Sequence, residues 1–398
     1  MNPIVVAGAG PAGCAVALYL AQNNIPVILL EGRADLPLDL RASTFHPPTL
    51  DMLSELDLTA PMVEQGLVVP TYQYRDRRTN EVAEFNLERL SGETKFPYRL
   101  QCEQFKMTRL TIEKLEALPN AEVRFSHQVI GCREHSDRVD VLCYTDRGEE
   151  RIPASFLIGA DGADSNVRRS SGVMYEGDTY PERFLVASTT FPFEEHFENL
   201  AWVNYVSDPD EWCVLLKTVD LWRVLVPTPI EADGDRFLAD DYIQSRLQRL
   251  IAKDGDYDVV HRTLYRVHQR VAERYRVRDR VLIVGDAAHI NNPLGGMGMN
   301  GGVHDAFNLA EKLVSVVKHG SNYHEQFDLY ERQRRGICVK FVQEHTKRNK
   351  ALMEATEASI QTKRQADLMK ACSDPELEKT FLMRTSMINS VRESYAIR

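Results

Sequence analysis

Three stretches of the chain share one order of hydrophobic and polar positions. They span residues 3–31, 154–172 and 280–317. Each has a short apolar run typical of a buried strand, then a glycine-rich turn, then a segment with helical periodicity. In the first stretch a second apolar run follows at residues 27–30. Because strands that alternate with helices favour a parallel sheet, the pattern predicts one nucleotide-binding α/β domain assembled from distant parts of the chain.

The intervening sequence has a different pattern. Short β-rich runs at residues 202–206, 212–218 and 221–226 are separated by Asp-Pro-Asp and Pro-Thr-Pro turns. A shorter stretch at residues 71–96 is similar, and the chain beyond residue 322 is helical and rich in charge. This pattern predicts an antiparallel sheet inserted into the nucleotide-binding domain.

The fold class predicted is α/β, or α+β overall, in three parts. A Rossmann-like nucleotide-binding domain is expected from residues 1–70, 97–183 and 266–345. An inserted, mostly antiparallel β-sheet substrate domain is expected from residues 71–96 and 184–265. Residues 346–398 are expected to form a C-terminal helical region, loosely docked from residue 368 onward.

Composition and charge narrow the class of protein. The 398 residues are 43% hydrophobic, which excludes a largely disordered chain, and the net charge of −10 argues against a nucleic-acid partner. The seven cysteines show neither C-x-x-C nor zinc spacing, which favours reduced thiols and no metal site. No apolar run reaches the ~18 residues of a membrane span, and the chain opens on a strand rather than a signal peptide. A cytoplasmic protein is therefore expected, with no membrane partner.

The first glycine-rich turn has the spacing of a dinucleotide-binding motif. Gly8, Gly10 and Gly13 form G-x-G-x-x-G between two predicted strands, and Glu31 follows about 20 residues later. The glycines permit a tight turn, a close approach of pyrophosphate and close packing of helix on strand, while the carboxylate can reach ribose hydroxyls. The acid disfavours a 2′-phosphate, so the motif indicates FAD or NAD and leaves that choice open; a glycine-rich turn without a ligand is the alternative.

The third glycine-rich turn favours a flavin. Asp286 ends an apolar run, where its carboxylate can accept hydrogen bonds from ribityl hydroxyls. The backbone N–H groups near Met299 and Asn300 open a helix and can face the edge of a flavin ring, where reduction places negative charge. The alternative for Asp286 is a helix cap.

The three turns together resemble a known family, the single-component FAD-dependent aromatic hydroxylases of the p-hydroxybenzoate hydroxylase type. Residues 8–13 match the dinucleotide motif, residues 159–168 match the family's "DG" motif and residues 285–300 its "GD" motif, so that the resemblance covers about residues 1–345. It implies that Arg41 contacts the FAD pyrophosphate and that Gln104 lies near the flavin. The cofactor-binding residues expected from the motifs and the resemblance are Gly8, Gly10, Pro11, Ala12, Gly13, Glu31, Gly32, Arg33, Arg41, Gln104, Asp161, Gly162, Gly285, Asp286, Gly298, Met299 and Asn300.

The resemblance also implies an activity. NADH or NADPH would reduce the flavin, O2 would form a C4a-hydroperoxide, and an activated aromatic or heteroaromatic ring would be hydroxylated. The partners would be a small aromatic substrate, O2 and NAD(P)H, with a homodimer expected only by analogy. The alternatives are another flavin reaction on the same fold, such as epoxidation, halogenation, oxidation or reduction, or a flavin-binding protein without turnover; the W-x-W-x-I-P sequence of flavin halogenases is absent.

The substrate is expected between the flavin and the inserted sheet. The resemblance places the Pro293 carbonyl beside the reacting position, and Arg223, on an apolar strand, needs a partner that is either a substrate anion or an internal acid. Core packing is favoured for each tryptophan, and a solvated helix face for Arg168-Arg169 and Arg332-Arg334-Arg335. The catalytic candidates are Pro293, His289, Arg223 and Tyr205, and the substrate-contacting candidates are Trp212, Leu215 and Trp222.

Overall fold

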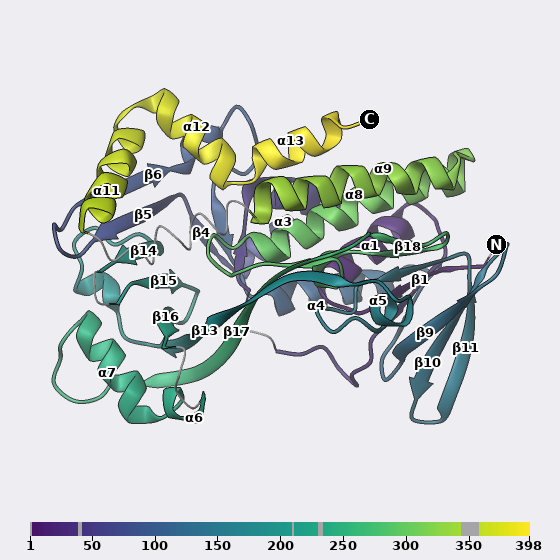
Figure 1. The fold of residues 1–398 in the computed structure, drawn as a ribbon, viewed down its shortest axis with the longest axis horizontal. Helices are drawn as coiled ribbons and strands as arrows, with labels where there is room; N and C mark the ends of the chain where they lie inside the picture. The colour runs from purple at the N-terminus through teal and green to yellow at the C-terminus, as the bar shows by residue number, and fades with distance from the viewer. Residues whose placement is uncertain (1, 39–41, 209–210, 230–233, 344–357) are drawn as a thin grey trace.

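The computed structural model describes residues 2–38, 42–208, 211–229, 234–343 and 358–398. A largely parallel sheet forms one half of the molecule (Figure 1). Its strand order is β18-β19-β12-β1-β2-β8, and all neighbours are parallel except β18 and β19. The strands are β1 (Ile4–Ala7), β2 (Val27–Leu30), β8 (Ala121–Arg124), β12 (Phe156–Gly159), β18 (Arg276–Arg278) and β19 (Val281–Ile283).

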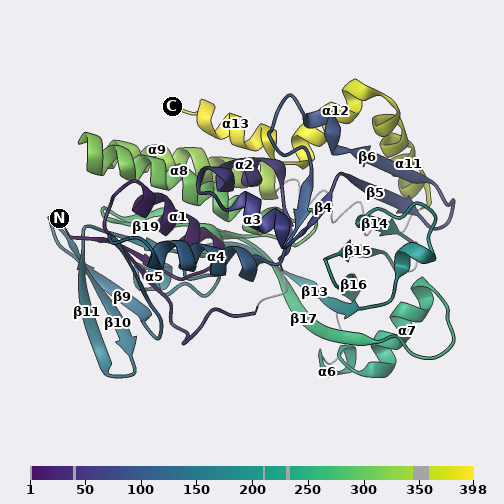
Figure 2. The same cartoon turned by 180° about the vertical axis from the view of Figure 1, so that it is seen from behind.

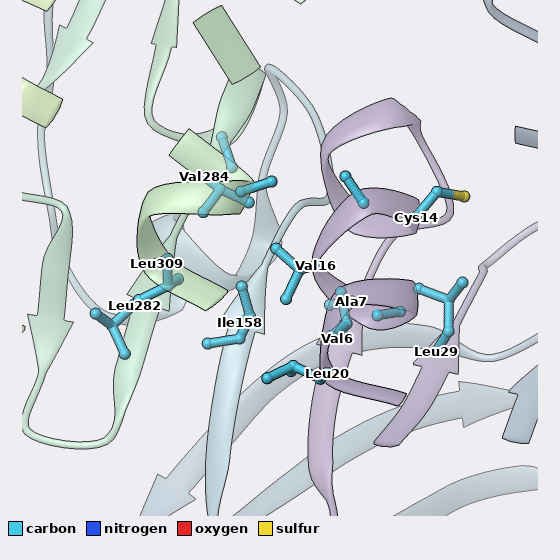
Figure 3. Packing of buried hydrophobic residues seen from close by; sticks show 14 of the residues in the cluster. Val6, Ala7, Cys14, Val16, Leu20, Leu29, Ile158, Leu282, Val284 and Leu309 are labelled. Carbon is cyan, nitrogen blue, oxygen red and sulfur yellow. The ribbon is translucent and has the colours of Figure 1, made fainter. Parts of the chain in front are cut away.

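The strands of this sheet are apolar because both of its faces are covered. Every residue of β1, β2, β12 and β19 is buried. Helix α1 (Pro11–Gln22) packs against β2 and against α4 (Gln104–Glu116) and α8 (Met297–His319). Figure 3 shows side chains of α1, β12 and β19 gathered in this core, among them Val16, Ile158 and Leu282.

A second sheet forms the other half. Its strand order is β20-β17-β13-β16-β15-β14-β5-β6, and only the β14–β5 pair is parallel. Helix α7 (Asp240–Leu250) covers one face, and α11 (Ala358–Ser373) and α12 (Pro375–Thr385) pack on the other (Figure 2). The strands are β5 (Thr71–Asp76), β6 (Val82–Asn86), β13 (Tyr175–Thr189), β14 (Val203–Ser207), β15 (Cys213–Lys217), β16 (Trp222–Thr228), β17 (Val259–Ala272) and β20 (His289–Ile290).

The expected fold class is confirmed: a discontinuous α/β part, an inserted, mostly antiparallel sheet and C-terminal helices. The expected domain borders at residues 183 and 265 fall inside the long strands β13 and β17, which run without a break between the two halves. The division into a cofactor-binding and a substrate-binding part therefore stays a proposal, with its border inside continuous strands.

Two small sheets were not predicted. Strands β9 (Gln128–Glu134), β10 (Val139–Thr145) and β11 (Gly148–Ala154) form one, and β3 (Thr44–Phe45), β4 (Leu67–Val69) and β7 (Arg99–Gln101) form the other. The β3, β4 and β7 strands are two or three residues long, so no periodicity can reveal them. The remaining α-helices are α2 (Pro47–Glu55), α3 (Thr59–Glu64), α5 (Asn166–Ser170), α6 (Gly234–Phe237), α9 (Tyr323–Ile337) and α13 (Ile388–Ala396). Short 3-10 helices are η1 (Leu87–Leu90), η2 (Phe193–Glu195) and η3 (Gly285–Ala287), and η4 (Cys338–Gln343) is a π-helix.

The expectation of a loosely docked C-terminal end was wrong. Leu382 and Ser394 are fully buried, and the Phe381 ring stacks on Phe85 of β6 with centroids 4.3 Å apart. Only a few apolar residues, set among many charged ones, make this contact. The sequence pattern is therefore similar to that of a solvent-exposed helix.

All seven cysteines are free thiols. Within the part of the chain that the structure describes, no helix combines the length and apolar character that a membrane crossing requires.

Candidate functional site

The three glycine-rich turns meet at one edge of the parallel sheet. Strands β1, β12 and β19 are neighbours that run in the same direction, so the turns that follow them emerge side by side. The Ala160 N–H donates to the Ala7 carbonyl at 2.8 Å, and the Val284 N–H donates to the Gly159 carbonyl at 2.9 Å. The carboxyl edge of a parallel sheet is where α/β proteins bind nucleotides.

The glycines of the first turn differ in what surrounds them. Gly8 has φ +102°, and a Cβ there would lie 2.4 Å from the Ala160 carbonyl oxygen; a Cβ on Gly13 would lie 1.9 Å from the Gly8 carbonyl oxygen. A Cβ on Gly10 would meet nothing within 4 Å, and no side chain caps the N-terminus of α1. Gly8 and Gly13 therefore allow the turn to pack, while Gly10 leaves backbone open where a phosphate can approach.

Glu31 is held in place at the end of β2. Its Oε2 accepts a hydrogen bond from the Ala9 N–H at 3.1 Å and its Oε1 accepts one from the Arg33 N–H at 3.0 Å. The side chain is half-buried, whereas Gly32 and Arg33 are exposed beside it. A carboxylate fixed beside the glycine turn suits the hydroxyls of a ribose.

The turn after β19 is also closely packed against its neighbours. The Asp286 residue is exposed between buried neighbours, and the Tyr175 hydroxyl donates to the Asp286 carbonyl at 2.9 Å. Gly285 has φ +60°, and a Cβ there would lie 3.0 Å from the Cβ of Ala12. The third turn thus lies against the first.

The start of α8 is tied to strand β3. The Asn300 side chain accepts from the His46 N–H at 2.9 Å and donates to the Thr44 carbonyl at 2.8 Å. Gly298 and Met299 are half-buried, and the Pro293 carbonyl accepts from the Gly296 N–H at 3.0 Å. The side chain of Asn300 is therefore occupied in holding the start of α8 against the segment around β3.

The "DG" segment contains a carboxylate with one unpaired oxygen. Asp161 Oδ2 accepts from the Val167 N–H at 3.1 Å, and the buried Oδ1 has no hydrogen-bond partner. Burial raises the pKa of Asp161 by more than its hydrogen bonds lower it, so the pKa lies above its ordinary value. Gly162 has φ +79° and open space where a Cβ would lie.

Arg168 joins this segment to the third turn. Its guanidinium donates to the Ala287 and Ala163 carbonyls, both at 2.7 Å, and lies 3.8 Å from the ring centroid of Tyr175. The residue is buried. The expectation of a solvated helix face was therefore wrong for Arg168, although Arg169 beside it is exposed.

His289 lies in a buried ionic cluster. Its Nε2 is 2.7 Å from Asp305 Oδ2, and Arg334 Nε is 2.7 Å from Asp305 Oδ1. Burial lowers the pKa of His289, but Cys338 and Asp305 raise it by more, and its pKa lies well above the ordinary value. Buried in this way, His289 supports the turn that carries Asp286, and Arg334 too was wrongly expected on a solvated face.

The residues expected around the substrate divide between the two faces of the second sheet. Tyr205 and Trp212 belong to the cluster under α12, whereas Leu215 and Trp222 belong to the cluster beneath α7. The Trp222 Nε1–H donates to Glu194 at 2.5 Å. Leu215 and Trp222 are therefore core residues on the face opposite to Tyr205 and Trp212.

Arg223 faces away from Trp222, because neighbours along a strand point to opposite faces. Its Nη2 is 3.4 Å from Glu103 Oε1, so of the two expected kinds of partner the structure shows the internal acid. Gln104 is half-buried at the start of α4, and its N–H donates to the Ala42 carbonyl at 3.0 Å. Arg41 lies outside the described residues.

These residues fit an extended dinucleotide that carries a flavin. Glu31 after β2, the open backbone at Gly10 after β1 and the exposed Asp286 after β19 lie along one sheet edge in the order that the adenosine ribose, the pyrophosphate and the ribityl chain require. Arg168 and Asp305, which hold the turns together, escaped the sequence analysis because their partners lie on distant elements.

Comparison with known proteins gives consistent results. A family model described as "FAD binding domain" matches residues 1–345. Para-nitrophenol 4-monooxygenase from Pseudomonas sp. (strain WBC-3) is 31% identical over 98% of this chain and 97% of its own length. The 6-hydroxy-3-succinoylpyridine 3-monooxygenase HspB from Pseudomonas putida (strain DSM 28022 / S16) is 33% identical over 85% of this chain and 86% of its own. The crystal structure of p-nitrophenol 4-monooxygenase PnpA from Pseudomonas putida DLL-E4 superposes with a TM-score of 0.91, at 29% identity over 98% of each chain.

Proposed function

The chain belongs to the FAD binding domain family and is a flavin-dependent aromatic monooxygenase, and from that premise we propose that it hydroxylates an activated aromatic or heteroaromatic ring at the expense of NADH or NADPH. In the balanced reaction one atom of O2 enters the ring as a hydroxyl group. The other leaves as water, and NAD(P)H and a proton are consumed. The convergence of the three glycine-rich turns at one sheet edge is the observation that supports the proposal most directly.

The protein's part in this reaction is to hold and orient the cofactor. The backbone around Gly10 would take the pyrophosphate, Glu31 the ribose hydroxyls and Asp286 the ribityl chain. The N–H groups of Met299 and Asn300 would face the ring edge that gains negative charge on reduction. When bound, FAD would supply the redox chemistry, because it can accept a hydride from NAD(P)H and activate O2 by the route named above.

The substrate side would be the face of the second sheet that carries Tyr205 and Trp212. Leu294, which follows Pro293, belongs to the same buried cluster as these aromatic residues. An apolar surrounding excludes water, which protects reactive oxygen species from unproductive decay. The proposal does not use His289 as an acid or base, because its side chain is bound to Asp305 in the ionic cluster.

The substrate class we propose is a phenol or hydroxypyridine with a polar substituent. The names of two relatives that align along most of this chain refer to a nitrophenol and to a hydroxylated succinoylpyridine. Both are rings already activated by a hydroxyl group. We also propose a cytoplasmic location and, by analogy, a homodimer.

The test is a substrate screen with purified protein loaded with FAD. Phenols and hydroxypyridines are expected to stimulate NAD(P)H consumption and O2 uptake together, with a product heavier by one oxygen atom. Adding catalase distinguishes coupled hydroxylation from release of hydrogen peroxide, because catalase returns O2 only where hydrogen peroxide has formed. If substrate were converted while NAD(P)H was oxidised without O2, a flavin reductase would replace this proposal; if no ring stimulated turnover, a flavin-binding protein without turnover would.

A further inference from the structure

A second buried arginine, Arg99 on β7, lies at the substrate face of the inserted sheet. The residue is 2% exposed, and its Nε and Nη1 atoms have no hydrogen-bond partner. It forms no ion pair with any aspartate or glutamate in the described part of the chain. Arg223, by contrast, is paired with Glu103.

The surroundings of Arg99 are aromatic. Its guanidinium lies 3.9 Å from the ring centroid of Tyr72, which suits a cation–π contact. Burial lowers the pKa of Arg99, but Tyr205, Tyr72 and Tyr74 raise it by more, so the group stays charged. Tyr205 also forms a hydrogen bond with the guanidinium, which leaves Nε and Nη1 as the donors without a partner. We call Tyr72, Tyr74 and Tyr205 the tyrosine box: the rings of Tyr74 and Tyr205 stack at 4.8 Å, and Tyr72 meets Tyr205 edge-on at 6.4 Å.

The tyrosine box is part of a buried cluster that reaches the residue directly after Pro293. Tyr72, Tyr205 and Leu294 belong to one buried cluster, and Leu294 directly follows Pro293. Helix α12 closes the box from the other side, where the Tyr72 hydroxyl and the Thr385 hydroxyl are 3.0 Å apart. Arg99, which has no acidic partner among the described residues, therefore lies on the side of the sheet where an aromatic substrate is expected.

Glu103, the acid four residues along the chain, forms no ion pair with Arg99. Glu103 is 2.8 Å from Lys106 and 3.4 Å from Arg223, so two cations already share it. Burying a cation without an anionic partner costs free energy, and replacing such a group by an apolar side chain of similar volume is often neutral or stabilising. A ligand that supplies the anion would explain why the site contains a buried cation in spite of this cost.

We propose that Arg99 is a substrate-binding residue, whose unpaired N–H donors bind the anionic oxygen group of an aromatic ring seated against the tyrosine box. This inference rests on the proposed aromatic substrate and names its class: rings that carry a carboxylate, phenolate or comparable oxyanion. The planar guanidinium can donate two parallel hydrogen bonds to such a group, whereas a neutral substituent would leave the cation unpaired.

The test measures binding without turnover, using FAD-loaded protein and no NAD(P)H. The probes are 4-hydroxybenzoate and its uncharged isostere 4-hydroxybenzamide, both at pH 6, where their phenol groups stay protonated, and 4-nitrophenolate at pH 8, each titrated by calorimetry. The wild type is expected to bind each anion at least 10-fold more tightly than the amide. Arg99→Met is expected to weaken binding of the anions by about 100-fold and that of the amide by less than about 3-fold.

Two further variants control for charge and for folding. Arg75→Met removes a half-buried arginine from β5, where it follows Tyr74 and points to the opposite face, and is expected to leave all three affinities unchanged. Arg99→Lys keeps the charge without the planar fork and is expected to retain part of the preference. Arg99→Met is also expected to melt at the wild-type temperature or above it, since it removes an unpaired buried charge.

The outcomes separate this inference from the proposed function. Wild-type protein that binds the amide as tightly as the anions would overturn the inference, whatever the variants do. So would an Arg99→Met protein that keeps the anion preference, or one that loses thermal stability while its preference stays intact, because Arg99 would then serve packing alone. An anion preference that depends on Arg99 in a protein that oxygenates no ring would leave the inference standing and refute the monooxygenase proposal.

Discussion

Replacing Asp305 by asparagine is expected to destabilise the protein by about 3–5 kcal/mol. The carboxylate lies 2.7 Å from Arg334 and 2.7 Å from His289, and all three side chains are almost completely buried. Removing one partner of a buried ion pair leaves the other charge without compensation, which typically costs ~3–5 kcal/mol. The amide of asparagine keeps the shape of the side chain, so the loss measures charge rather than packing.

The magnitude can be converted into a melting temperature. Unfolding entropy near 60 °C is about 2.1 cal/mol/K per residue, so a chain of 398 residues has roughly 0.8 kcal/mol/K, and the loss corresponds to about 4–6 °C. Asp328→Asn is the matched control. Asp328 is also 2.7 Å from an arginine, Arg276, but its side chain is 56% exposed. An exposed pair contributes about 0–1 kcal/mol, so this variant should melt within about 1 °C of the wild type.

The pH dependence provides a second check. Burial lowers the pKa of His289, but Cys338 and Asp305 raise it by more, so its folded pKa lies well above 6.5. A raised folded pKa stabilises the fold fully below the unfolded pKa of about 6.5, and this stabilisation is lost as pH rises through the folded pKa. Burial raises the pKa of Asp305, but His289 and Arg334 lower it by more, so its contribution persists down to acid pH. The difference in Tm between wild type and Asp305→Asn should therefore be largest near pH 5–6 and narrow, without vanishing, toward pH 9, because Arg334 remains charged.

Thermal melts of the FAD-free proteins followed by circular dichroism at several pH values give the measurement. A variant that melts within 1 °C of the wild type at pH 6 would refute the reasoning. So would a loss for Asp328→Asn equal to that for Asp305→Asn, because burial would then not decide the strength of these pairs.

Three further predictions concern the cofactor site and the C-terminal helices. Gly10→Val should abolish FAD binding without lowering the Tm of the FAD-free protein, because a Cβ there meets only open space; a yellow purified variant would contradict the placement of the pyrophosphate. Asp286→Ala should weaken FAD about 10- to 100-fold in a fluorescence titration, since it removes charge-assisted hydrogen bonds, and unchanged affinity would show that the third turn has been misinterpreted. Leu382→Ala should cost about 2–5 kcal/mol and lower the Tm by several degrees, whereas Leu377→Ala on the exposed side of the same helix should have little effect; equal melting of the two variants would argue that α12 is not docked.

The cofactor site could be predicted because its requirements are local. In the first turn Gly8 adopts φ +102° and Gly13 lies against the Gly8 carbonyl. Only glycine fits both positions, so the requirement is visible in a motif of a few residues. The same holds for an acid at the end of a strand, as at Glu31. Such features depend on the backbone of one short segment, and three of them in order are enough to predict one sheet edge.

The substrate face could not be predicted to the same depth because it depends on strand register. Trp222 and Arg223 are adjacent, so alternation places them on opposite faces, but it does not say which face meets the flavin. The pairing of Leu216 with Arg223 across β15 and β16 decides this, and only the structure gives that register. The substrate candidates predicted from the sequence therefore come from both faces, and two of the three, Leu215 and Trp222, lie in the cluster beneath α7.

Arg99 shows why unpaired charges are the hardest functional residues to find in a sequence. Its strand is three residues long, and the groups around it come from β5, β14 and the helix that carries Thr385, which is 313 residues from Tyr72. An arginine in a short apolar strand can be paired, as Arg223 is, or unpaired, as Arg99 is, and the two cases look alike in the sequence. The difference appears only when every donor is matched to its acceptor in the folded chain. What distinguishes the proposed ligand-binding arginine from a structural one is thus the absence of an acidic partner, a property of the packed interior that no local pattern encodes.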